Sequence, residues 1–341
     1  MSVFTEKIAL LHTLQELLQK PKKILITSHL NPDGDAIGSI MGLGLSLEAV
    51  GHSITLVVPN PMSAYLRYLD PEKRVLNFDE HSISVQKAID SAELIFCLDY
   101  NTLSRVEKMG ELIGATPVPK VLIDHHQNPD DFEFQFSDPE VSSTSEMVFD
   151  FLDQINLVEK INEHAAMCLY TGIMTDTGSF RYRGTTSNTL LVGSKLVALG
   201  ANPAYINDAV HNSSRFDRLQ LTGFTLHERL VYQPEIRLSY MYLLLEDLER
   251  FNYESGDTEG LVNMPLGISD VDISVFFKEV EKGKIKISFR SKGEVFVNEF
   301  ASQFFEGGGH RNAAGGVSYK SWEETQRYFL EKFKTFYGYA Y

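Results

Sequence analysis

Residues 23–39 read KILITSHLNPDGDAIGS, and this stretch decides the fold class. Its apolar run ends at polar residues, a turn with Pro and Gly follows, and a helix with spaced glycines is predicted over residues 36–50. Short apolar runs that end at polar turns are typical of buried strands. We therefore predict a strand over residues 23–27, followed by the turn and the helix.

The remainder of the first half repeats this alternation. Three further apolar runs of strand length lie at residues 54–58, 94–98 and 121–123. Continuous apolar runs with polar ends suit parallel strands that are covered by helices on both faces. Helical patterns then dominate, over residues 144–154, 161–174, 187–199, 204–211 and 215–230.

The pattern changes after residue 233. Strands are predicted at 236–245, 271–280 and 285–289, the last two spaced for a hairpin, and a final helix at 321–337. The sequence thus predicts an α/β protein of two domains. We expect an N-terminal domain with a mainly parallel sheet flanked by helices (1–200), a helical linker (201–233), and a smaller C-terminal α+β domain with a mixed sheet (234–341).

Composition narrows the class of protein. Of 341 residues 43% are apolar, which is enough for a large core, and 46 acidic against 31 basic residues give a formal net charge of −15. This charge argues against binding of long duplex nucleic acid, which needs a basic face. No apolar run approaches membrane-spanning length, and the first 20 residues predict a helix rather than a secretory leader. Cys97 and Cys168 lie in apolar runs, so we expect buried thiols and a cytoplasmic protein.

Four groups of ionisable residues each follow an apolar segment. They are His29 with Asp33 and Asp35, then Asp99, then Asp124-His125-His126, and finally Asp176 at the end of an apolar helix. Parallel α/β sheets bind ligands at the carboxyl ends of their strands. Taken alone, Asp33 and Asp35 could belong to an acidic turn in which Asp35 caps the following helix. Asp99 alone could cap a loop. Together they indicate a divalent metal site.

The chemistry of these groups supports that interpretation. Carboxylates with imidazoles suit Mn²⁺ and related divalent ions, and no thiolate is required. Four carboxylates packed together would repel one another unless cations lay between them. Two divalent ions sharing one carboxylate would form the bridged pair that activates water for phosphoryl transfer.

The motifs in this order and spacing resemble those of the DHH phosphoesterase family. Residues 307–316, GGGHRNAAGG, resemble the glycine-rich motif of the DHH-associated domain found in many members. The resemblance covers nearly the whole chain and is greatest to members of the nanoRNase and pAp-phosphatase type, some of which are labelled exopolyphosphatase-related.

The resemblance implies a site for two divalent ions, with Mn²⁺ expected and Mg²⁺ or Co²⁺ as further options. One ion would be held by His29, Asp33 and Asp99. The other would be held by Asp35, Asp99, His125 and Asp176, so that Asp99 is the bridge. His126 would contact phosphate or donate a proton, and Asp124 would orient a histidine.

Substrate contacts are expected mainly in the second domain. Consecutive glycines let backbone N–H groups approach an anion, which makes Gly308 and Gly309, with His310 and Arg311, candidate phosphate or base contacts. In the family a similar Arg-Ser pair holds a terminal phosphate, which implies that role for Arg290 and Ser291. Arg181 follows Asp176 closely and could also contact phosphate or base. The local alternatives are a tight turn, a solvated strand end and an arginine paired with a nearby carboxylate.

These features predict a dinuclear-metal phosphoesterase. It would hydrolyse short oligoribonucleotides and dinucleotides of the pApA type to mononucleotides, and 3′-phosphoadenosine 5′-phosphate (pAp) to AMP. The alternatives are a cyclic-di-AMP phosphodiesterase, a pyrophosphatase or exopolyphosphatase, a single-strand DNA exonuclease, and a non-catalytic nucleotide- or tRNA-binding module. The family also implies a homodimer, and no membrane partner is expected.

Overall fold

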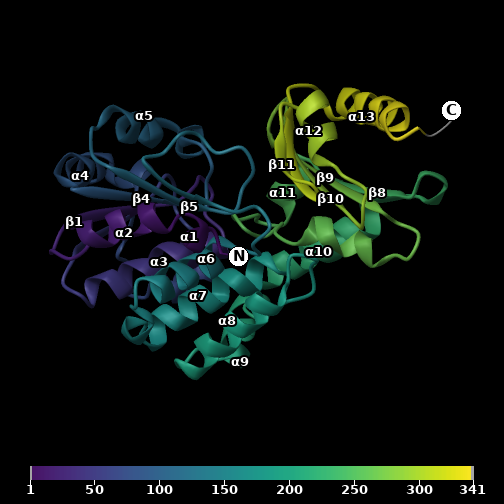
Figure 1. Ribbon diagram of the computed structural model, residues 1–341. Coiled ribbons are helices and arrows are strands. Elements are labelled where there is room, and N and C mark those ends of the chain that lie inside the picture. Colours follow the sequence, from purple (N-terminus) through teal and green to yellow (C-terminus); the bar gives the residue numbers. More distant parts are fainter. Residues whose placement is uncertain (1, 339–341) are drawn as a thin grey trace. The chain divides into compact units, whose positions relative to one another are not determined.

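The computed structural model describes residues 2–338 (Figure 1). The chain divides into two compact units, one up to Ser213 and the other from Ser214 onward. This division falls inside the segment 201–233 that the sequence assigns to a linker.

The first unit is built on a six-stranded, wholly parallel sheet in the order β3-β2-β1-β4-β5-β6. The predicted parallel sheet is confirmed. The strand order reverses between β1 and β4, and such a switch point is where open parallel sheets bind ligands. The strands are β1 (Lys23–Thr27), β2 (Ser53–Val58), β3 (Val75–Asn77), β4 (Leu94–Leu98), β5 (Lys120–Asp124) and β6 (Phe134–Ser137).

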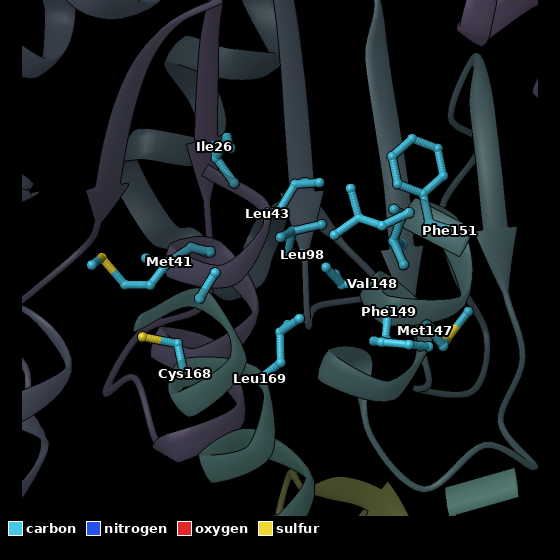
Figure 2. Packing of buried hydrophobic residues seen from close by; sticks show 14 of the residues in the cluster. Ile26, Met41, Leu43, Leu98, Met147, Val148, Phe149, Phe151, Cys168 and Leu169 are labelled. Atoms are coloured by element: carbon cyan, nitrogen blue, oxygen red, sulfur yellow. The ribbon is translucent and has the colours of Figure 1, made fainter. Parts of the chain in front are cut away.

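Helices cover both faces of this sheet. Ile24 and Ile26 of β1 pack into a core with helices α3, α6 and α7, whereas Leu25 faces the opposite core with α4 and α5. Figure 2 shows part of the first core, around Ile26 and Leu169. The helices are α1 (Val3–Glu6), α2 (Ile8–Leu17), α3 (Gly34–Glu48), α4 (Phe78–Ser91), α5 (Glu107–Ala115), α6 (Thr144–Gln154), α7 (Glu163–Asp176), α8 (Ser187–Ala198) and α9 (Pro203–His211), with short 3₁₀ turns at Ala64–Leu69, Leu103–Val106 and Val158–Lys160.

Glycines spaced by four residues let α3 approach α7 closely. A Cβ on Gly38 would lie 2.5 Å from the carbonyl oxygen of Cys168, and one on Gly42 would lie 2.4 Å from Leu169. Larger residues at these positions would separate the helices. This close contact holds the start of α3, which carries Asp35, against the helix that ends at Asp176.

The second unit contains a mixed six-stranded sheet in the order β11-β12-β10-β9-β8-β7. Among the described strands of this unit only β8 and β9 pair in parallel, and β9 and β10 form the predicted hairpin. Its strands are β7 (Leu230–Gln233), β8 (Leu238–Leu243), β9 (Ile273–Glu281), β10 (Lys284–Ser291), β11 (Gly308–His310) and β12 (Ala313–Ser318). Its helices are α10 (Phe216–Glu228), α11 (Leu245–Arg250), α12 (Asn298–Phe304) and α13 (Trp322–Phe336), with 3₁₀ turns at Pro234–Ile236 and Leu261–Gly267.

The apolar core of the second unit is rich in aromatic rings. Phe329 and Phe333 of α13 pack against Phe300 of α12 and Phe289 of β10. The final helix therefore covers one face of the sheet with its aromatic stripe. Among residues 2–338, no helix has the length and apolar character needed to span a membrane.

Candidate metal centre

The parallel sheet of the first unit brings three of the predicted groups together. His29 follows β1, Asp99 follows β4, and residues 124–126 close β5, and these three strands are neighbours in the sheet. Their carboxyl ends meet at one edge because all of them run in the same direction. Asp176 reaches the same place from the end of α7.

The first group of candidate ligands consists of His29, Asp33 and Asp99. His29 Nε2 lies 3.3 Å from Asp99 Oδ2 and 3.9 Å from Asp33 Oδ2. His29 Nδ1 lies 2.9 Å from the carbonyl oxygen of Leu30, the arrangement in which Nδ1 carries the proton and Nε2 presents its lone pair to a metal. One ligand atom from each of the three residues lies within 4.8 Å of the others.

Asp33 also caps helix α3. Its Oδ1 accepts hydrogen bonds of 3.0 Å from the N–H groups of Asp35 and Ala36. The helix begins at Gly34, two residues earlier than the sequence indicated, so the idea that Asp35 caps it is wrong. The cap holds Asp33 in place and leaves its second oxygen facing His29.

The second group consists of Asp35, His125 and Asp176. His125 Nε2 lies 3.3 Å from Asp176 Oδ2, 3.9 Å from Asp35 Oδ2 and 3.4 Å from Asp99 Oδ1. One oxygen of Asp99 therefore faces His29 of the first group, and its other oxygen faces His125 of the second. A carboxylate in that position can be shared by two ions.

The protonation of these groups shows how strongly the site favours positive charge. Burial raises the pKa of Asp35 to about 7, with a further rise from the charge of Asp99. Burial also raises the pKa of Asp176 well above its usual range, and Asp35 adds to the rise. Burial would lower the pKa of His29, but the hydrogen bond to Asp99 and the nearby carboxylates raise it to about 9. Cations could replace the protons held here, so the donor set fits divalent metal ions.

His126 and Asp124 form a separate pair beside these ligands. His126 Nδ1 lies 2.7 Å from Asp124 Oδ1, and the His126 N–H donates to Asp124 Oδ2 at 3.1 Å. Asp124 is fully buried. The carboxylate therefore fixes the orientation of the His126 ring, whose Nδ1 is 3.8 Å from Asp99 Oδ1.

The N-terminus of α6 contributes contacts that the sequence reasoning missed. The N–H groups of Thr144 and Ser145 donate to the two oxygens of Asp35, at 2.7 and 2.8 Å, and Thr144 Oγ1 donates to Asp99 Oδ1 at 3.1 Å. Ser143 caps the helix by accepting from Glu146 N–H at 3.1 Å. The run SSTSE at 142–146 was an available signal, because a Ser cap followed by Glu three residues later marks a helix start.

In the second unit, Arg290 and His310 lie in one row of the sheet. Arg290 of β10 is opposite Ala313 of β12, which in turn is opposite His310 of β11. Directly opposed residues lie on the same face, so these two side chains share a face with one strand between them. Arg290 also donates to the carbonyl oxygen of Phe289 at 2.9 Å.

The neighbouring candidate substrate contacts, Ser291 and Arg311, interact with other residues of the second unit. Ser291 is buried, donates to the carbonyl oxygen of Val295 and accepts from Asn312 Nδ2. The guanidinium of Arg311 lies 5.4 Å from the ring centre of Phe296. These contacts give Ser291 and Arg311 roles within the unit.

Gly308 and Gly309 of the glycine-rich motif differ in how much space surrounds them. A Cβ on Gly309 would lie 2.6 Å from the carbonyl oxygen of Ala313, and φ at Gly309 is 136°. A Cβ on Gly308 would meet no atom of the described residues within 4 Å. Gly309 is therefore needed for the pairing of β11 with β12, whereas Gly308 leaves space above the strand.

Arg181 lies in the first unit, on the loop after Asp176. Its Nε donates to the carbonyl oxygen of Gly178 at 2.6 Å, and the residue is exposed. The structure thus places this arginine on the loop that directly follows the predicted metal ligand Asp176.

Comparison with known proteins agrees with this geometry. Residues 23–173 match the model of the DHH family, N-terminal domain, and residues 237–338 match that of the DHHA1 domain. The chain is 32% identical over 319 residues to the bifunctional oligoribonuclease and PAP phosphatase NrnA of Thermus thermophilus, covering 92% of this chain and 89% of that protein. It is 29% identical to the protein of the same name from Bacillus subtilis, with coverages of 89% and 91%. A crystal structure of an exopolyphosphatase-related protein from Bacteroides fragilis superimposes with a TM-score of 0.91 at 36% identity, covering 96% of each chain.

Proposed function

This chain belongs to the DHH family of phosphoesterases, and on that premise we propose that it uses two divalent ions to hydrolyse short oligoribonucleotides. The substrates we assign are dinucleotides of the pApA type, cleaved to mononucleotides, and pAp, cleaved to AMP. Relatives named oligoribonuclease and PAP phosphatase support this choice of substrates.

The position of Asp99 carries the proposal. Its two carboxylate oxygens face two different histidines, His29 at 3.3 Å and His125 at 3.4 Å. We assign one ion to His29, Asp33 and Asp99, and the other to Asp35, Asp99, His125 and Asp176. Mn²⁺ is the expected ion because oxygen and imidazole donors suit it, with Mg²⁺ or Co²⁺ as further options.

The side chains around the ions have distinct roles in this proposal. When bound, a pair of divalent ions supplies Lewis-acid charge for the transfer of a phosphoryl group to water. His126 has its Nδ1 engaged by Asp124, so its contact with phosphate, or its donation of a proton to the leaving oxygen, would be made through Nε2. Thr144 and Ser145 hold Asp35 in place through their N–H groups.

The second unit would bind a phosphate of the substrate. Arg290 and His310 share one face of the sheet and could both contact a terminal phosphate. Gly308, two residues before His310 on β11, leaves room for the approach of an anion to the backbone. We also assign the protein to the cytoplasm, as its two buried free thiols suit a reducing compartment, and we expect a homodimer.

A substrate panel with an Asp99→Ala variant tests this proposal. With Mn²⁺, the wild type should hydrolyse pApA and pAp faster than cyclic-di-AMP or polyphosphate. Asp99→Ala removes a ligand of both ions and should lower kcat on pApA more than about 100-fold. Asp90→Ala, at an exposed position on α4, is the matched control and should keep wild-type turnover.

Two results would contradict the proposal. Full turnover by Asp99→Ala would exclude the bridged pair of ions. Faster hydrolysis of cyclic-di-AMP or of polyphosphate than of pApA would assign one of the alternative substrates instead.

A further inference from the structure

The loop that follows Asp176 has an unusual backbone. Gly178, Ser179 and Phe180 have φ values of 55°, 61° and 62°, so three consecutive residues are left-handed, two of them not glycine. The N–H groups of Arg181 and Tyr182 both donate to the carbonyl oxygen of Thr177, at 2.9 and 3.0 Å, and close the turn. Such a conformation is costly and persists where the surrounding structure holds it, often at binding sites.

Two aromatic rings of this loop have opposite environments. The ring of Phe180 packs inward, 5.6 Å from the ring of Tyr170, and anchors the loop to the core of the first unit. The side chain of Tyr182, by contrast, is 43% exposed. The loop therefore presents one aromatic ring to solvent while the other fixes its position.

The exposed ring rests on the backbone of Gly178. A Cβ added to Gly178 would lie 2.4, 2.6 and 2.7 Å from Cζ, Cε2 and Cε1 of Tyr182. These three atoms, and not the hydroxyl oxygen, are the nearest, so the glycine lies under a face of the ring rather than at its tip. One face of the ring is thus supported by the chain.

Both ends of the loop adjoin the metal centre. Its first residue, Thr177, follows the ligand Asp176 directly. Farther along, a Cβ on Gly184 would lie 3.7 Å from Cα of Ser142, two residues before Thr144, whose hydroxyl contacts Asp99. The exposed ring of Tyr182 therefore lies on a segment that begins directly after Asp176 and passes Ser142, just before the start of α6.

We propose that Tyr182 is a stacking platform for the nucleobase of the nucleotide whose phosphate is cleaved. The inference rests on the proposed function and specifies how the substrate is recognised. A ring supported on one face can stack a base on the other, and the exposed Arg181 and Arg183 on either side add positive charge for the phosphates. Because every base has a π-face, this platform accepts all four nucleobases.

The test compares pAp with the same sugar 3′,5′-bisphosphate that carries hydrogen in place of the base. For Tyr182→Ala, KM for pAp should rise about 10-fold, whereas KM for the baseless compound should stay at the wild-type value. Tyr182→Phe keeps the ring and should behave as wild type with both substrates. Tyr182→Leu keeps apolar bulk without a π-face and should resemble Tyr182→Ala.

The outcomes separate this inference from the proposed function. If the wild type hydrolyses neither pApA nor pAp, the proposed function fails and the inference with it. If the wild type hydrolyses pAp but Tyr182→Ala leaves KM for pAp unchanged, only the stacking role is overturned. An equal rise in KM for both substrates would also overturn it, because it would indicate a general disturbance of the loop.

Discussion

Left-handed backbone occurs at or beside three of the predicted metal ligands. Asn31 lies between His29 and Asp33 with φ of 55°, Asp99 itself has φ of 63°, and Ser179 follows Asp176 with φ of 61°. Each such residue costs on the order of 1–3 kcal/mol and persists because its neighbours hold it. The N–H of Asn31, for example, donates to Asn60 Oδ1 at 2.6 Å. The backbone is therefore locally destabilised at the positions where the predicted ligands must converge.

Asp150 allows a prediction for a single residue away from the metals. Burial raises the pKa of its carboxyl to about 6, and the charge of Glu146 adds to the rise. The folded state therefore holds this proton more tightly than the unfolded chain, so Asp150 destabilises the fold as pH rises from about 4 through 6. Asp150→Asn should raise Tm by a few degrees at pH 8, as measured by thermal unfolding, and should have little effect near pH 4.

A control distinguishes this effect from a general change in surface charge. Asp153 lies one turn further along α6 at an exposed position. Asp153→Asn should leave Tm within about 1 °C of wild type at both pH values. An equal gain in Tm for Asp150→Asn at pH 4 and pH 8 would contradict the titration argument.

At the level of whole elements, helix α6 connects the candidate metal centre to helix α8. Glu146 is buried in α6 and accepts hydrogen bonds from Ser142 Oγ, Thr189 Oγ1 and Asn188 Nδ2. The two last donors belong to α8, so this carboxylate fixes the start of α6 in position. The N–H groups at that start hold both oxygens of Asp35.

Glu146→Gln should therefore weaken metal binding without touching a ligand. An amide has one acceptor oxygen where the carboxylate has two, so one donor would lose its partner, at a cost of about 1–3 kcal/mol. We expect a lower Tm and Mn²⁺ affinity about 10-fold weaker by calorimetric titration. Glu140→Gln, in the exposed turn before α6, should leave both measurements unchanged. Unchanged Mn²⁺ affinity in Glu146→Gln would show that the contacts of Glu146 do not affect how α6 holds Asp35.

Several elements lacked a signal that sequence reasoning could use. Strand β11 consists of Gly308, Gly309 and His310, and β12 begins with two alanines and two glycines, so neither shows an apolar alternation. Strands β3 and β6 have only three and four residues. These strands form because neighbouring strands offer unpaired N–H and C=O groups, which is a property of the assembled sheet. The long apolar runs, by contrast, were predicted close to their observed bounds.

For the whole molecule, the net charge of −15 sets an expectation about substrate length. A long polyanion would be repelled by the acidic surface, whereas a short one interacts mainly with the cations at the site. At 20 mM salt, kcat/KM for pApA should exceed that for a 24-nucleotide RNA by more than about 10-fold. Raising the salt to 200 mM should lower the ratio of the two kcat/KM values, because salt screens the repulsion between distant exposed charges. Equal values for both substrates at low salt would contradict this expectation.

The sequence by itself determined the class of the fold and the residues of the candidate site. Apolar runs that end at His29, Asp99 and Asp124 were enough to predict a parallel sheet with these groups at one edge, because strands joined through helices run in the same direction and the residues after each run are read directly from the sequence. The family resemblance drawn from those motifs is confirmed by the matches to the DHH and DHHA1 domains.

Only the tertiary structure decided how these residues face one another. That Asp99 turns one oxygen to each histidine, and that α6 holds Asp35 from 109 residues away, follows from the packing of distant elements. The same holds for Ser291, whose hydroxyl is used within its own unit, and for Tyr182, whose ring rests on Gly178. The physical reason is that side-chain orientation depends on close packing of distant segments, which a local sequence pattern does not encode.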